Sequence, residues 1–220
     1  TNAYVVWQDD STYQTAGDAT STGDVYYRKI SYSVSSTTWT ITPPLTSAPT
    51  ILSQDGVADY AFAPIIAASA TSGYVHVVWS GTGVSTSDDK LYHRRSADSG
   101  ATFGSTTHLS PGLSVDSLIR NPDIAVDGSK VYVAWQDTRE INAKVFFAKS
   151  VDNGASWGTD TKLSDTIMDT WPPGLASDHV NGGTQTTWGY NSIYYAYETG
   201  SIRANIDLTP SYPVTLEVVA

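Results

Sequence analysis

The chain has 220 residues, of which 40% are hydrophobic and 15% charged, with 7 Trp and 14 Tyr. This composition is too apolar and aromatic for a disordered chain, and the length suits a single domain, residues 1–220, with a substantial core. The net charge of −10 disfavours phosphate-rich partners, so we expect no nucleic-acid partner. No apolar run reaches the roughly 18 residues of a membrane span, so we expect no membrane insertion. The absence of Cys excludes disulfides and thiolate metal sites.

The first predicted repeat covers about residues 1–50. Its markers are a segment with alternating apolar residues that ends in Trp7 and an aromatic segment at 25–28. Alternation with period two and aromatic or β-branched residues are typical of strands. Residues 31–39 follow as a degenerate turn motif that lacks both Asp and Gly. Because the chain starts on the Trp-bearing strand, we expect this repeat to lack an inner strand of its own.

The second and third predicted repeats, at about 58–112 and 119–166, are complete. Each has a small-residue inner strand, a Trp strand ending in Trp79 or Trp135, an aromatic strand, a turn and a short outer strand. The turns have the pattern Ser-x-Asp-x-Gly-x-Ser/Thr-aromatic. Their residues are Ser96, Asp98, Gly100, Phe103, Ser150, Asp152, Gly154 and Trp157. In such a turn the Asp accepts backbone N–H bonds, Gly supplies a positive φ and the aromatic ring packs inward.

The fourth predicted repeat, at about 170–208, has a weaker Trp strand ending in Trp188 and no recognisable turn motif. One further strand is predicted at 214–219, within the closing segment 210–220. This strand either completes the first repeat of its own chain, exchanges with a neighbouring molecule, or links to more protein in a longer parent chain. All three alternatives fit the pattern.

The motifs at 135–139, 145–150 and 152–157 resemble the repeats of Asp-box, sialidase-like β-propeller secreted proteins, also called bacterial neuraminidase repeats. The resemblance implies an all-β fold, a β-propeller of about four four-stranded Asp-box blades. It also implies that the turn motifs are structural and lie on the face opposite the ligand-binding face. Such propellers usually have six or more blades, so four is a departure from the family.

Polar and aromatic residues on the expected binding face are candidate ligand contacts. They are Arg120, Asn121, Asp137, Arg139, Glu140, Trp171 and Tyr190. Two adjacent acidic pairs could supply oxygen ligands to calcium as a cofactor, although neither has the spacing of a dedicated loop. They are Asp9, Asp10, Asp88 and Asp89.

A sialidase-type enzyme would need three arginines for the substrate carboxylate, and only Arg120 and Arg139 are expected on the binding face. We therefore assign no catalytic residue and expect a non-catalytic extracellular or cell-surface module, with glycans or other copies of itself as partners. The alternative is a sialidase-type glycoside hydrolase or a fragment of one.

Overall fold

The computed structural model describes residues 1–9, 23–53, 58–69, 72–83, 89–110, 117–140, 142–164, 173–178, 183–189, 192–197 and 203–207. All regular secondary structure in this part of the chain is β-strand, and the strands form four antiparallel four-stranded sheets. The predicted all-β class is therefore confirmed. No helix long and apolar enough to cross a membrane occurs among the described residues.

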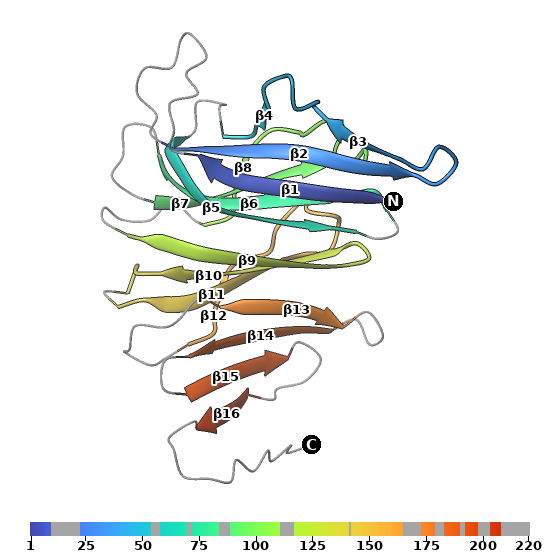
Figure 1. Cartoon of the computed structure of the whole chain (residues 1–220). Helices are drawn as coiled ribbons and strands as arrows, with labels where there is room; N and C mark the ends of the chain where they lie inside the picture. Colours follow the sequence, from blue (N-terminus) through green and yellow to red (C-terminus); the bar gives the residue numbers. More distant parts are fainter. Residues whose placement is uncertain are drawn as a thin grey trace. The chain divides into compact units, whose positions relative to one another are not determined.

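The chain divides into two compact units, residues 1–116 and 117–220, with two sheets in each (Figure 1). The assignment of all four repeats to one domain stays a prediction. The segment 210–220 lies outside the described residues, so its predicted role as a closing or exchanged strand also stays a prediction.

The first sheet begins with the predicted Trp strand. It contains β1 (Asn2–Asp9), β2 (Asp24–Ser33), β3 (Thr38–Thr42) and β4 (Thr50–Ile51). β2 pairs with all three other strands, and β1 is the edge strand in the described part. Among the described residues, no strand of the first repeat pairs with the free edge of β1, which agrees with the expected lack of an inner strand.

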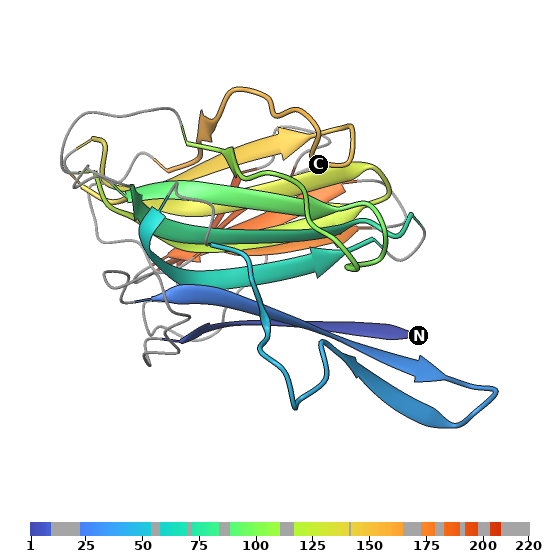
Figure 2. The ribbon, with the colours of Figure 1, turned by 90° about the horizontal axis from the view of Figure 1, so that it is seen from above.

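The segment 31–39 forms an extended hairpin instead of a degenerate turn motif. β2 and β3 pair from Lys29↔Thr42 to Ser33↔Thr38, and this hairpin projects past the start of β1 (Figures 1 and 2). Its residues are mostly Ser, Thr and aromatic residues, which favour pleated structure, and it has no Asp or Gly to close a tight turn at Ser31.

The second sheet has the strand order expected for a complete repeat, inner to outer. It contains β5 (Ala58–Ala68), β6 (Val75–Gly83), β7 (Asp89–Ser96) and β8 (Thr107–His108). β6 is buried on both faces from Val75 to Gly81, which explains why its side chains are almost all apolar or small.

The second unit repeats this order twice. Its third sheet contains β9 (Ile119–Asp127), β10 (Lys130–Asp137), β11 (Lys144–Ser150) and β12 (Thr161–Lys162). Its fourth sheet contains β13 (Gly174–Asp178), β14 (Gly183–Gly189), β15 (Ser192–Tyr197) and β16 (Arg203–Asp207).

The core of the first unit lies between its two sheets. Its fully buried members are Val25, Tyr27, Leu52, Ala61, Val77, Trp79 and Tyr92. Trp79 stacks on Tyr92 with ring centroids 5.8 Å apart. In the second unit the equivalent Trp135 is also fully buried and stacks on Phe146. The repeated Trp therefore packs in the core of both complete repeats.

The two predicted turn motifs have almost the same hydrogen bonds. Asp98 Oδ1 accepts the N–H groups of Ala101 and Thr102 at 3.0 and 2.8 Å, and Asp152 Oδ1 accepts those of Ala155 and Ser156 at 3.0 and 2.9 Å. Ser96 Oγ and Ser150 Oγ donate to these carboxylates at 2.6 and 2.7 Å.

Each turn also contains a glycine with positive φ, Gly100 at 76° and Gly154 at 72°. In the first unit the turn is fixed to the neighbouring sheet. Phe103 packs edge-on against Tyr27 at 4.8 Å, and Tyr27 Oη donates to the carbonyl of Gly100 at 3.0 Å. A turn in the second sheet thus helps to hold the first sheet in place.

Candidate functional site

In the second and third sheets the start of the inner strand lies beside the end of the Trp-bearing strand. The register pairs Ala58 with Gly83 in the first unit, and Ile119 with Asp137 in the second. The turn motifs begin at Ser96 and Ser150, where β7 and β11 end, and so lie at the other end of these sheets. We call the end where β5 or β9 begins the inner-strand end.

β5 and β9 each contain a β-bulge near this end. The register shifts between Phe62 and Ile65 in β5, and at the same repeat position in β9. In each bulge the residue before a proline has positive φ, 50° at Ala63 and 51° at Asn121. Bulges of this kind redirect side chains and are common beside functional sites.

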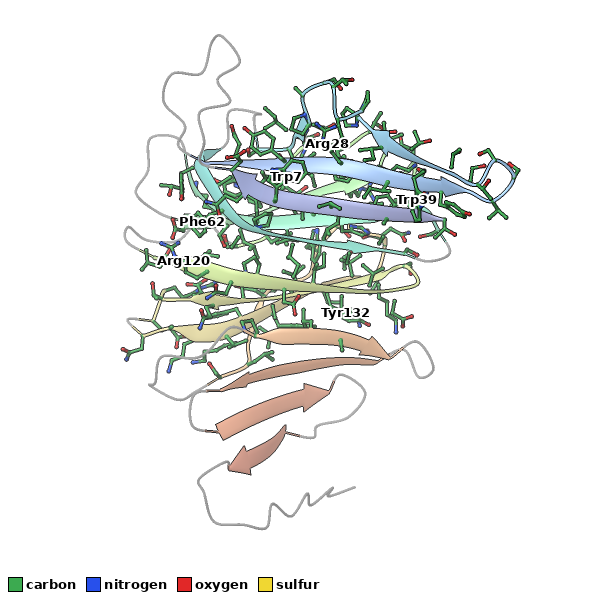
Figure 3. All side chains as sticks on the ribbon, viewed as in Figure 1. Trp7, Arg28, Trp39, Phe62, Arg120 and Tyr132 are labelled. Carbon is green, nitrogen blue, oxygen red and sulfur yellow. The ribbon has the colours of Figure 1, made fainter. Side chains whose placement is uncertain are left out.

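The bulge places two residues of each inner strand on one face. Arg120 pairs with Gln136 and Asp123 with Ala134, and these partners are two residues apart on β10, so Arg120 and Asp123 share a face. The equivalent positions in the second sheet are Phe62 and Ile65. Figure 3 shows Phe62 and Arg120, each near the start of its strand within its own unit. The third sheet therefore carries a cation and a carboxyl where the second is apolar.

Asp123 is a half-buried carboxyl on this face. Its Oδ1 accepts the N–H of Ile124 at 2.8 Å and its Oδ2 accepts the N–H of Leu175 in β13 at 2.6 Å. Burial raises the pKa of Asp123, and these two backbone hydrogen bonds only partly oppose the rise. A carboxyl with a raised pKa can hold a proton for transfer, which is the property of a general acid.

A glutamine that follows the repeated Trp contacts each bulge. Gln8 Oε1 accepts the N–H of Ala63 at 3.2 Å, and Gln136 Oε1 accepts a bond from Asn121 Nδ2 at 2.6 Å. Gln8 Nε2 also donates to Tyr60 Oη at 3.2 Å. The glutamines thus fix the backbone on which the candidate side chains stand.

The predicted ligand residues Asp137 and Arg139 form an ion-pair network. Asp137 is fully buried, and its Oδ2 accepts bonds from Arg139 Nε at 2.8 Å and from Trp135 Nε1 at 3.3 Å. Arg139 also bonds Asp160 and lies over the Phe146 ring at 3.9 Å. Burial lowers the pKa of Arg139, but hydrogen bonds and charge from Asp137 and then Asp160 outweigh it and raise the pKa. Two carboxylates thus already balance this cation.

The other predicted ligand residues lie in different environments or outside the described residues. Glu140 forms an exposed ion pair with Lys162 at 2.9 Å. Arg120 Nη1 donates to the carbonyl of Ile119, and Asn121 is the bulged residue. Trp171 and Tyr190 lie outside the described residues. Arg120 and Asn121 are therefore the predicted residues that the structure places beside Asp123.

The structure describes one residue of each acidic pair proposed for calcium. Asp89 is buried and accepts a bond from Thr82 Oγ1 at 3.2 Å, and Asp9 lies at the end of β1. Asp10 and Asp88 lie outside the described residues. The described part of the chain contains no group of three or more His, Cys, Asp or Glu that could hold a metal ion.

Two side-chain features were missed from the sequence. Asp123 is marked only by its place in the repeat, where the aligned residues are Ile65 and Gly174. His76 and His93 stack in the second sheet, with His76 Nδ1 and His93 Nε2 3.1 Å apart. They lie diagonally on paired strands, with His76 opposite Arg95 and His93 opposite Val78, and this becomes apparent only when the β6–β7 register is known.

No family model and no curated protein matches the sequence. Among solved structures, the chain is similar to the α-L-arabinanase of Penicillium chrysogenum in complex with arabinobiose. The TM-score is 0.56 at 13% identity, over 93% of this chain and 63% of that one. It is also similar to the GH93 α-L-arabinofuranosidase of Fusarium graminearum with arabinobiose. There the TM-score is 0.54 at 13% identity, over 83% of this chain and 61% of that one. The chain thus spans less than two thirds of either neighbour.

These neighbours are β-propeller glycoside hydrolases, so the predicted propeller architecture is confirmed at the level of the fold. They also correct one expectation. The sequence was interpreted as a non-catalytic module, whereas the structures that share its fold are enzymes, which agrees better with the alternative of a glycoside hydrolase.

Proposed function

We propose that this chain is a glycoside hydrolase, or the propeller portion of one, that acts on a neutral glycan of the arabino-oligosaccharide class. The observation that carries the proposal is Asp123, a half-buried carboxyl with a raised pKa on a bulged inner strand of a glycosidase-type fold. Asp123 would protonate the leaving oxygen, while Arg120 and Asn121 would donate hydrogen bonds to sugar hydroxyls.

A neutral substrate is favoured because several arginines are already engaged. Arg28 donates to the carbonyls of Pro43, Pro44 and Ser47, and Arg94 to those of Leu52 and Gly104. Arg139 is balanced by two carboxylates. These contacts argue against the three-arginine grip that a sialic acid carboxylate would need.

Hydrolysis by this route also needs a second carboxylate, as nucleophile or base. Asp137 and Asp160 are paired with Arg139, and Glu140 with Lys162, so we do not assign this role to any of them. The proposal thus assigns only the acid group.

The experiment is an activity assay with 4-nitrophenyl α-L-arabinofuranoside and with linear arabinan. The Asp123→Asn variant should lose about 100-fold or more of the wild-type rate, because its side chain cannot supply a proton. Asp127→Asn, at the other end of β9, is the matched control and should keep the rate. Lack of turnover by the wild-type chain on both substrates would reject the class of enzyme. Full activity of Asp123→Asn would reject only the role of this residue.

A fluorogenic sialoside is the third substrate of the assay and tests the sialidase alternative.

We further propose that the two turns are Asp boxes, supported by their matching carboxylate bonds. We also propose that the protein acts outside the cell or at its surface, where polymeric glycans occur. Fractionation of the native source, with detection of the chain in the medium or on the cell surface, tests this location.

A further inference from the structure

The β2–β3 hairpin and the loop that follows β3 expose an unusual amount of apolar surface. Val34 is 76% exposed, Trp39 66% and Leu45 73%, all within residues 34–45. Trp is the largest apolar side chain, and exposing it costs free energy unless it has a partner. In Figure 3 Trp39 lies on this hairpin, and Phe62 lies at the other end of the same unit. The exposed surface is thus separate from the inner-strand end.

One face of the hairpin is aromatic and aliphatic. Tyr32 pairs with Trp39 across the strands and Ile30 pairs with Ile41, so all four side chains share a face. The Tyr32 and Trp39 rings lie 4.7 Å apart, tilted by 43°. We call these four residues the Trp39 platform.

Hydroxyl groups lie in the turn next to the platform, at Ser35 and Ser36, and on the opposite face of the hairpin, at Ser33 and Thr38. Between the two strands, Ser33 Oγ lies 3.1 Å from Ser35 Oγ, and Ser36 Oγ lies 2.7 Å from Thr38 Oγ1. Thr40 also belongs to the face opposite Trp39. An exposed aromatic pair next to a hydroxyl-rich turn fits a sugar, whose C–H groups stack on the ring while its hydroxyls exchange hydrogen bonds with polar groups nearby.

The segment carries no charge. Residues 30–54 contain no Asp, Glu, Lys, Arg or His, in a chain with a net charge of −10. The nearest cation on the same face is Arg28, whose guanidinium is directed to the carbonyls of Pro44 and Ser47, each at 2.7 Å. A charged ligand would find no counter-charge here, so a neutral ligand is favoured.

We propose that the Trp39 platform binds a neutral polysaccharide chain. It is a second carbohydrate site, on the hairpin that replaces the turn motif of the first repeat and at the end of the sheet opposite the inner-strand end. Such a site would hold the protein on a polymer and leave the inner-strand end free to meet it. The platform goes beyond the proposed hydrolysis and does not depend on it.

A second explanation is that the Tyr32–Trp39 pair only stabilises the hairpin, since cross-strand aromatic pairs support strand pairing. The two explanations differ in what the ring contributes. Stabilisation requires the pair within one molecule, whereas binding requires that Trp39 stay open to solvent and that its loss weaken retention by polysaccharide.

The test is native gel electrophoresis of the full chain in gels containing soluble linear arabinan or hydroxyethyl cellulose, with polygalacturonate as the anionic comparison. We expect at least one neutral polymer to retard the wild-type chain and polygalacturonate to have no effect. Trp39→Thr keeps a strand-forming residue and should weaken retention about tenfold or more, whereas Trp39→Phe should keep most of it. Leu45→Ala, also exposed, is the matched control and should behave as wild type.

Either of two gel results would overturn the proposal. One is the absence of retardation in both neutral gels. The other is equal retardation of wild type and Trp39→Thr with unchanged thermal unfolding. Light scattering on the same samples tests a second copy as the occupant, because a dimer that Trp39→Thr dissociates also overturns it. Loss of turnover in Asp123→Asn with unchanged retardation would separate this site from the hydrolytic one.

Discussion

At the scale of single residues, the fold depends on positions where only glycine fits. A Cβ on Gly100 would lie 2.0 Å from Tyr27 Oη, whereas a Cβ on Gly128 would meet nothing within 4 Å. Both residues have positive φ, 76° and 57°. They therefore separate the cost of the backbone conformation from the cost of a steric clash.

We expect Gly128→Ala to lower the free energy of unfolding by roughly 1–2 kcal/mol, the cost of a left-handed backbone for a residue with a Cβ. Gly100→Ala should cost roughly 1–3 kcal/mol more, because Tyr27 must move out of a packed core. Urea unfolding of the two variants measures the difference. Equal losses would contradict the view that the turn is held by contact with Tyr27.

The buried histidine pair predicts how stability changes with pH. Burial is the main cause that lowers the pKa of His76 to about 4 and of His93 to about 3, with nearby Arg95 acting in the same direction. The unfolded chain takes up these protons near pH 6.5, so the pair is fully stabilising above that pH. Its contribution is lost as the pH falls from 6.5 towards the lowered values.

We therefore expect the free energy of unfolding of the wild type, measured by urea titration, to fall between pH 6.5 and 4, by up to about 1.4 kcal/mol per histidine for each pH unit. The double variant His76→Phe, His93→Leu should show a flatter dependence over this range, whatever its stability at pH 7. His108→Gln, an exposed histidine, should keep the wild-type slope. A double variant with the wild-type slope would show that other groups cause the loss.

At the scale of elements, the turns predict a second pH dependence at lower pH. Hydrogen bonds hold the pKa of both carboxyls well below the ordinary value, from Ser96 and then Thr102 to Asp98, and mainly from Ser156 to Asp152. A carboxylate with a lowered pKa stabilises the fold fully above its unfolded pKa of about 4. That contribution is lost as the pH falls towards the lowered value.

Asp98→Asn and Asp152→Asn should each lower the melting temperature at pH 7, and the difference from wild type should shrink as the pH falls below about 4. Thermal unfolding from pH 7 to 2.5 measures this difference. Because the histidine range lies mostly above pH 4, the two effects can be distinguished in one series. A difference that stays constant down to pH 2.5 would mean that the charge of these carboxylates does not stabilise the turns.

The elements also show what could be predicted from sequence. The spacing of Trp79 and Trp135 was enough to predict the strand order of the second and third sheets. The hairpin was missed because residues 31–39 retain the spacing and the aromatic residue of the turn motif. The two groups that close such a turn, a carboxylate and a positive-φ glycine, are absent there, and the chain continues as paired strands.

At the scale of the whole molecule, the all-β class and the repeat were predictable, but the candidate site was only partly so. Arg120 and Asn121 were identified from their place near a strand start. Asp123 could not be, because its face depends on a one-residue register shift opposite Trp135. The expectation of a non-catalytic module rested on the number of arginines available to bind the carboxylate of an acidic sugar. That number carries no information about enzymes that act on neutral glycans.

The bulges in β5 and β9 have a consequence for protein engineering. In each bulge the residue before the proline is constrained by its positive φ, whereas the residue after it is Ile65 in one sheet and Asp123 in the other. The same backbone thus accepts an apolar side chain or an acid at that position. Libraries that keep Ala63, Pro64, Asn121 and Pro122 and randomise positions 65 and 123 would vary the chemistry of the inner strands while conserving their path.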